Sequence, residues 1–180
     1  AMPSLANITW ERLEREGSVT TPCPAPDAPG EEIEFAERFP TATGRARLVP
    51  AGLSDPAEMP DRDFPFVLPT GRELEHWHTG AMTRRAAVLD ALQPAPTVSL
   101  APAELRRLGA APGERLRVAT RRGAVELAAR EDPALPEGMA FIPFAYREAA
   151  ANLLTDPTLD PFGRIPGFKY CAARLERVAV

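Results

Sequence analysis

The sequence predicts a mainly-β protein with short helices (α+β), folded as a small closed or nearly closed barrel with helices at its ends. Short strand-like runs follow one another in the order strand, helical loop, strand, short helix, hairpin, strand and final strand. In residues 114–132, apolar and charged residues alternate on both sides of Arg122-Gly123, which marks the turn of a hairpin. Short strands separated by turn residues are typical of barrels.

The first sixty residues contain few regular elements. Residues 8–17 have the spacing of one or two helical turns, closed by Gly17. Four prolines between residues 22 and 29 stop any regular element. We expect a short strand at residues 32–39 and an edge hairpin at residues 44–50.

An acidic, proline-bearing linker runs from Pro56 to Asp63. We place the domain boundary there, with an N-terminal extension or linker arm at residues 1–60 and the barrel domain at residues 61–180. Ala1-Met2 resembles an artificial start, so we expect the chain to be a piece of a longer protein.

The barrel domain begins with an apolar strand, Phe64 to Leu68, after which Thr70-Gly71 turns the backbone out of the sheet. Apolar residues at helical spacing predict a helix from Met82 to Leu92, and Pro102 begins another helix that Gly109 ends. A further helix-like segment runs from Glu148 to Leu154, before a proline-rich loop. The other strands are expected at residues 97–100, 139–144 and 171–178 and in the hairpin formed by residues 114–123 and 124–132.

The candidate site lies in the stretch from Pro69 to Arg85, which contains both histidines of the chain. Loops that follow a strand end are common ligand sites, because the scaffold fixes the backbone while the loop supplies donors. Arg72 offers a fork of N–H donors suited to a phosphate or a purine edge. Two histidines and a tryptophan add ring faces, so this chemistry predicts a site for a large, flat, anionic ligand such as a nucleotide.

Composition excludes several classes of function. The net charge of −4 argues against a general nucleic-acid binder, and no apolar run is long enough to cross a bilayer. Two distant cysteines, Cys23 and Cys171, lack metal-type spacing and indicate a reduced, cytoplasmic protein.

The stretch TGRELEHWHTGAMTRR, with the later RLGAAPGERLRVATRRG, MAFIPF, AANLLTD and PGFKYCAARLE, resembles the C-terminal molybdopterin-guanine-dinucleotide-binding domain of molybdopterin oxidoreductases. Its first motif is most similar to formate dehydrogenase catalytic subunits. The resemblance implies a six-stranded double-psi β-barrel of the formate dehydrogenase/DMSO reductase C-terminal type. It also implies that the domain binds a bis-molybdopterin guanine dinucleotide cofactor of molybdenum or tungsten. Carried over by position, the cofactor-binding residues are Thr70, Gly71, Arg72, His76, Trp77, His78, Thr79, Asn152, Phe168 and Lys169.

In formate dehydrogenases the Fe–S cluster, the metal ligand and the catalytic histidine come from other domains. Two cysteines cannot supply the four ligands that an Fe–S cluster usually needs. We therefore expect a binding domain with no catalytic residue, no metal ligand and no turnover alone, with the cofactor bound in the full subunit and absent from this fragment. The full subunit would oxidise formate to CO2. Expected partners are the remaining domains of that subunit and electron-transfer subunits with Fe–S clusters, but neither nucleic acid nor membrane.

Three alternatives are open. The first is that the parent protein is another molybdopterin oxidoreductase, such as a nitrate reductase. The second is that the chain is a stand-alone interaction barrel without cofactor. The third is that Glu75, His76 and His78 bind zinc in a metallohydrolase. Individual residues also have plainer interpretations: an ion pair of Arg72 with a neighbouring glutamate, or a core position for Trp77.

Overall fold

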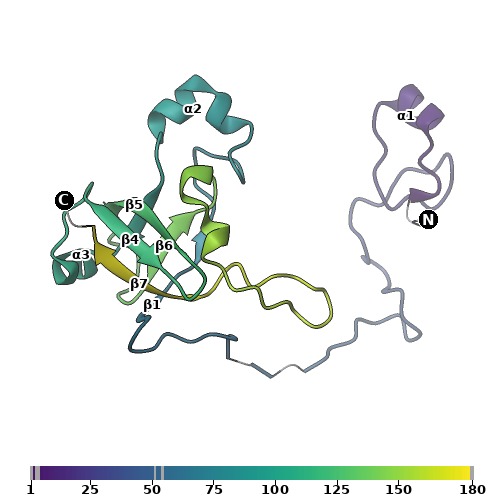
Figure 1. The fold of residues 1–180 in the computed structure, drawn as a ribbon. Coiled ribbons are helices and arrows are strands. Elements are labelled where there is room, and N and C mark those ends of the chain that lie inside the picture. The colour runs from purple at the N-terminus through teal and green to yellow at the C-terminus, as the bar shows by residue number, and fades with distance from the viewer. Residues whose placement is uncertain (1, 3–4, 51, 54, 179–180) are drawn as a thin grey trace. The chain divides into compact units, whose positions relative to one another are not determined.

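The computed structural model describes residue 2 and residues 5–50, 52–53 and 55–178. The chain divides into two compact units, residues 1–53 and 54–180, and each is considered by itself (Figure 1). None of the helices in the described ranges is long and apolar enough to cross a membrane.

The first unit is organised by one short helix, α1 (Trp10–Glu16). The Thr9 hydroxyl accepts from the Arg12 amide at the N-terminus, and Gly17 ends the helix at a φ of 75°, as predicted. The predicted strand at 32–39 and the hairpin at 44–50 are both wrong, because these residues form turns, bends and irregular backbone. Ile33 and Leu48 are 71% and 93% exposed, so neither segment has a core face to hold a strand.

A buried arginine holds the first unit together in place of a large core. Arg12 is 5% exposed, and its guanidinium pairs with Glu16 at 3.0 Å and donates to the Cys23 sulfur at 3.0 Å. It also donates to three backbone carbonyls, those of Asn7, Ala25 and Ala28. Helix α1 and the proline-rich loop are therefore joined through the donors of a single side chain.

The second unit is a strongly curled sheet with the order β1-β7-β4-β5-β3-β6-β2 (Figure 1). Most neighbouring strands are antiparallel, but β3 is parallel to β5 and β2 is parallel to β6. The strands are β1 (Phe66–Val67), β2 (Thr70–Gly71), β3 (Thr97–Leu100), β4 (Arg115–Ala119), β5 (Ala124–Glu131), β6 (Ala140–Pro143) and β7 (Ala172–Arg177).

The first and last strands in this order are two parts of one segment, and this closes the barrel. Residues 66–71 run along β7 with their first half and along β6 with their second half. Between the halves, the Leu68 amide donates to the Cys171 carbonyl, and the Pro69 carbonyl accepts from the Ile142 amide. Counting residues 66–71 as one strand gives six strands in the described chain, so the predicted six-stranded double-psi β-barrel is confirmed.

Thr70-Gly71 therefore continues the sheet, and the prediction that it turns out of the sheet is wrong. Pro69 has no amide hydrogen and interrupts the ladder for two residues, after which β2 pairs with a different neighbour. The backbone leaves the sheet only after Gly71, whose carbonyl accepts from the Phe144 amide.

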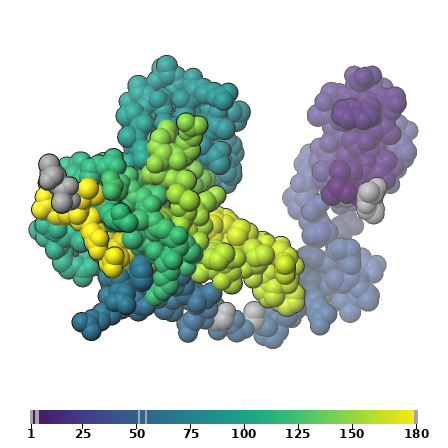
Figure 2. Space-filling view, in the orientation of Figure 1, coloured from purple at the N-terminus to yellow at the C-terminus, as the bar shows by residue number. Residues whose placement is uncertain are grey.

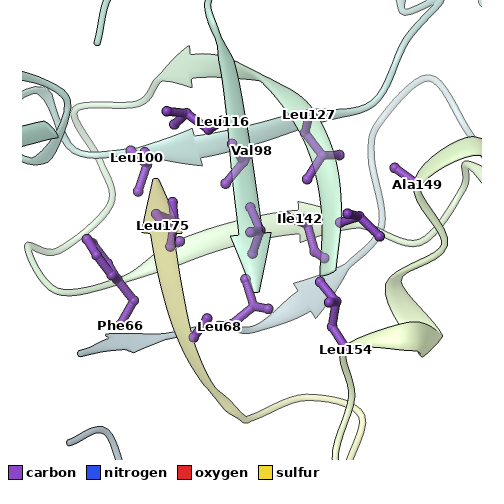
Figure 3. Packing of buried hydrophobic residues seen from close by; sticks show 14 of the residues in the cluster. Phe66, Leu68, Val98, Leu100, Leu116, Leu127, Ile142, Ala149, Leu154 and Leu175 are labelled. Atoms are coloured by element: carbon purple, nitrogen blue, oxygen red, sulfur yellow. The ribbon is translucent and has the colours of Figure 1, made fainter. Parts of the chain in front are cut away.

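The barrel interior is filled by alternate residues of the strands. In the predicted hairpin, β4 and β5 pair Leu116 with Leu127 and Val118 with Val125, and all four side chains point inward. Figure 3 shows side chains from every side of the barrel meeting at its centre, Leu68, Leu100 and Ile142 among them. A closed layer of buried aliphatic side chains supplies the main driving force for folding of this unit.

Two of the three predicted barrel-domain helices are corrected. Helix α3 (Pro102–Leu108) begins at its proline and ends at Gly109 with a φ of 64°, as predicted. The expected helix from Met82 to Leu92 is instead a 3₁₀ turn, η2 (Thr83–Arg85), followed after an extended Ala86 by α2 (Ala87–Leu92). The expected helix at 148–154 is two 3₁₀ turns, η3 (Arg147–Ala149) and η4 (Ala151–Leu153), separated by an extended Ala150.

Residues 55–63 lie along the barrel as a strap. Glu58 is bound by Arg121, Arg122 and the amide of Ala172, and Asp61 is bound by Arg121. The predicted linker is therefore in contact with the β4–β5 turn. The boundary between residues 60 and 61 stays a prediction.

Candidate functional site

A hollow lies beside the carboxyl end of β6. Its volume is about 350 Å³, and most of its lining is apolar and aromatic. We call it the strand-end hollow, and it is lined by Thr79, Phe144, Tyr146, Arg147, Ala150, Ala151, Asn152 and Phe168.

Sheet topology brings these residues together. Because β2 and β6 are parallel, both strands end at the same edge of the barrel, and the loops that follow them lie side by side. One loop carries residues 72–93 and the other carries residues 144–154. Figure 2 shows the two segments packed against each other, and Arg84 pairs with Glu148 across them at 2.8 Å.

Three of the ten residues expected to bind cofactor line the hollow directly. Thr79 comes from the first loop, Asn152 from η4 and Phe168 from the proline-rich loop before β7. Two more lie next to Phe168: the Thr70 hydroxyl donates to its carbonyl, and the Lys169 ammonium lies 5.5 Å from its ring centre. The proline-rich loop before β7 therefore folds back on the first strand end.

Three further expected residues form a row of neighbouring guanidinium and ring groups that leads to the hollow. The Arg72 guanidinium lies 5.3 Å from the Trp77 ring, and Trp77 meets His78 edge to face at 4.7 Å. His78, held at a φ of 50°, then lies 6.4 Å from the ring of Phe144 in the hollow wall. Trp77 is 58% exposed, so it is not a core residue. In the described ranges, Arg72 is exposed and no carboxylate lies within ion-pair distance of it.

His76 and Gly71 lie apart from the hollow. His76 is fully buried; its Nε2 lies 2.8 Å from the Gln93 carbonyl and its Nδ1 lies 3.4 Å from the Thr83 hydroxyl. A carbonyl only accepts, so Nε2 carries the hydrogen. Both ring nitrogens thus contact residues of the first loop itself. Among the described residues, no group of three or more His, Cys, Asp or Glu side chains is arranged to bind a metal ion, which removes the support for a zinc site.

Gly71 allows close packing against a neighbouring aromatic ring. It is buried in β2, and a methyl group at its Cα would lie 2.6 Å from the Phe141 ring. The absence of a side chain therefore lets the Phe141 ring cover this strand.

Sequence reasoning missed the aromatic and basic residues after β6. Phe144, Tyr146 and Arg147 line the hollow, and none of the three is among the ten residues expected to bind the cofactor. The rule that directed attention to Pro69–Arg85, polar residues after an apolar strand end, applies equally to the residues after MAFIPF. Arg147 is exposed and has no carboxylate partner within ion-pair distance in the residues that the structure covers.

A polar cluster lies beneath the first loop. The Tyr146 hydroxyl lies 2.9 Å from both the Glu73 carboxylate and the Gln93 carbonyl. Burial raises the pKa of Tyr146, and the Glu73 carboxylate raises it further. Burial is also the main reason that the pKa of Glu73 is raised, with the negative charge of Glu75 acting in the same direction.

A closed barrel with an aromatic, arginine-bearing hollow at its strand ends is the arrangement expected of a domain that holds a flat, anionic ligand. The comparisons with known proteins identify the family to which the chain belongs. The chain belongs to the family of the Molydopterin dinucleotide binding domain, whose model matches residues 66–172.

Curated relatives are similar over nearly the whole chain. The F420-dependent formate dehydrogenase 1 subunit alpha of Methanococcus maripaludis and the F420-dependent formate dehydrogenase subunit alpha of Methanocaldococcus jannaschii are each 36% identical over 98% of the chain. The periplasmic nitrate reductase of Desulfovibrio desulfuricans is 31% identical over 94% of it. The chain spans about a quarter of the length of these relatives, 26%, 26% and 24% respectively.

The same fold occurs in a solved structure. Acetylene hydratase from Pelobacter acetylenicus matches 65% of the chain with a TM-score of 0.59 and 22% identity, and the match covers 19% of that protein. The predicted family and fold class are therefore both confirmed.

Proposed function

We propose that the strand-end hollow and the row Arg72–Trp77–His78 form one wall of the pocket for a molybdopterin guanine dinucleotide in a formate dehydrogenase catalytic subunit. The family and the names of the two formate dehydrogenase relatives described above support this assignment. Their identity of 36% exceeds the 31% to the nitrate reductase, which favours formate dehydrogenase over that alternative.

The observation that carries the proposal is the meeting of Thr79, Asn152 and Phe168 in one hollow. These residues are far apart in the sequence and come from three loops. Phe144 and Phe168 offer aromatic faces to a flat ring system, and Asn152 offers an amide that both donates and accepts. Arg147 and Arg72 offer charged donors to phosphate groups. The donor set therefore fits a dinucleotide with a fused-ring base.

In this proposal the residues of the chain bind and orient the dinucleotide, and none of them is catalytic. When bound, the cofactor would supply the two-electron oxidation of formate at a molybdenum or tungsten centre carried by two such dinucleotides. Other domains of the same subunit would complete the pocket, and subunits with Fe–S clusters would receive the electrons. We place the subunit in the cytoplasm.

Calorimetric titration with GDP and GMP, with ADP as control, tests the proposal at low salt. We expect a preference for guanine, and we expect Arg147→Ala to weaken GDP binding by about 1.5–3 kcal/mol, the usual loss for a charge-assisted hydrogen bond. Arg62→Ala is the matched control, because Arg62 is exposed and does not line the hollow. Equal affinity for GDP and ADP, or equal losses in the two variants, would contradict the assignment.

A further inference from the structure

Tyr146 connects the hollow to the buried side of the first loop. Its ring lines the hollow, while its hydroxyl lies 2.9 Å from Glu73 Oε2 and 2.9 Å from the Gln93 carbonyl. Both neighbours are acceptors when Glu73 is ionised, but a tyrosine hydroxyl has only one hydrogen to donate. With Glu73 ionised, the Tyr146 hydroxyl can therefore form a hydrogen bond to only one of these two oxygens.

Protonation of Glu73 satisfies every group in the cluster. The acid then donates to the Tyr146 oxygen, and Tyr146 donates to the Gln93 carbonyl. That carbonyl has two lone pairs, and the His76 Nε2–H at 2.8 Å occupies the other. Three donors thus meet three acceptor sites, as buried polar groups require.

The surroundings of Glu73 shift its protonation equilibrium toward the neutral form, relative to an ordinary glutamate. Its environment includes Tyr146, the carboxylate of Glu75, the ring of His76 and the guanidinium of Arg130 on β5. Burial is the largest effect and raises the pKa of Glu73; the hydrogen bond from Tyr146 lowers it, Glu75 raises it, and the two basic groups lower it, with a net rise.

Arg84, which belongs to the first loop, contacts the ring of Tyr146. Its guanidinium lies 4.7 Å from the centre of the Tyr146 ring and is held by Glu148 and Asp90. The ring is therefore fixed on one side by Arg84 and at its hydroxyl by the cluster beneath the loop.

We propose that Glu73 is a positioning residue for the strand-end hollow: as a neutral acid it donates to Tyr146 and fixes the ring that forms part of the hollow wall. When Glu73 loses its proton to solvent, the Tyr146 hydrogen turns to the carboxylate and the bond to Gln93 is lost. The first loop, residues 72–93, is then tied less firmly to the wall. The effect on ligand binding rests on the function proposed above, but the proton position does not.

The direction of the pH effect follows from the raised pKa. A carboxyl group whose pKa is higher in the folded chain than in the unfolded chain stabilises the fold at low pH. This stabilisation is lost as the pH rises through the folded-state value. We therefore expect the cluster to weaken with rising pH, in contrast to an ordinary ion-paired glutamate.

The first test is NMR of the chain with carboxyl-¹³C-labelled glutamate, with the Glu73 signal assigned from Glu73→Gln. We expect its titration midpoint to lie above that of the same residue in the urea-unfolded chain. We also expect the melting temperature of the wild type to fall relative to Glu73→Gln as the pH rises, since the amide keeps an N–H donor for Tyr146. A midpoint at or below the unfolded value, or parallel pH profiles of the two proteins, would overturn the inference.

The second test measures GDP affinity on both sides of that midpoint. We expect the wild type to lose affinity at the higher pH by at least about fivefold more than Glu73→Gln, the lower end of typical coupling between sites. Equal losses would show that Glu73 does not position the wall. If GDP does not bind at any pH, the proposed function is contradicted, and the NMR midpoint alone decides the protonation of Glu73.

Discussion

Glu58 is the residue whose replacement tests the packing of the strap against the barrel. Its Oε1 accepts from Arg121 at 2.8 Å and from the Ala172 amide at 2.9 Å, and its Oε2 accepts from Arg122. The Glu58 side chain is 11% exposed, against 22% for Arg122 and 39% for Arg121. Glu58→Ala removes three contacts and leaves Arg122 with Asp156 at 3.6 Å as its remaining carboxylate.

The expected cost follows from these exposures. The bond from Arg121 is close to a surface ion pair and is worth roughly 0–1 kcal/mol. The bonds from Arg122 and the Ala172 amide are better shielded, and together they bring the expected loss to about 2–3 kcal/mol. Urea unfolding should register this loss as a shift of about 1–2 M in the midpoint for a domain of this size.

The matched control is Glu126→Ala, because Glu126 pairs with Arg115 at 3.4 Å on the exposed face of the same hairpin. We expect that change to cost less than about 1 kcal/mol. Burial raises the pKa of Glu58, but hydrogen bonds from Arg122 and the Ala172 amide outweigh it and lower the pKa overall. The stabilisation by Glu58 is therefore present above the pKa of an unfolded glutamate and is lost as the pH falls through the folded value. A loss in Glu58→Ala no larger than in Glu126→Ala would refute this reasoning.

Two further predictions concern the site. Gly71→Ala should destabilise the barrel by about 1–3 kcal/mol, because the added methyl group meets the Phe141 ring at 2.6 Å; urea unfolding checks this, and an unchanged midpoint would show that the ring moves freely. Phe168→Ala should weaken GDP binding by about 1–3 kcal/mol, the usual value of an aromatic ring stacked on a base. Phe162→Ala, on the same loop but exposed and outside the hollow, should leave GDP affinity unchanged, and calorimetry that finds equal effects would exclude stacking on Phe168.

Locally encoded elements of the fold could be predicted from the sequence. The β4–β5 hairpin has strict alternation around Arg122-Gly123, and α3 has a proline at its start and Gly109 at its end. Such features depend on neighbours in the chain, which a single sequence contains.

Elements that depend on distant partners could not be predicted in the same way. Apolar spacing from Met82 to Leu92 indicated a helix with a buried face, but Met82, Val88 and Leu92 are exposed and the segment breaks at Ala86. Closure of the barrel through residues 66–71 depends on pairing with β6 and β7, which lie far along the chain. Because Pro69 interrupts the strand pattern of that segment, the sequence does not indicate that residues 66–71 form one strand.

The same distinction between local and distant contacts applies to the candidate site. The chemistry of the first loop indicated an anionic ligand, but only the resemblance to a known family added Phe168. The roles of His76, which bonds to Gln93, and of Tyr146, which bonds to Glu73, depend on contacts across the loop that no sequence spacing encodes.

The most direct test of the central claim is to map GDP binding on the chain by ¹⁵N-¹H NMR. The account predicts shifts that concentrate in residues 72–80, 144–152 and 168–169, around the strand-end hollow, with little change in α3 at the edge of the barrel. Shifts confined to another surface, or equal shifts with ADP, would contradict the assignment of this hollow as the guanine dinucleotide wall.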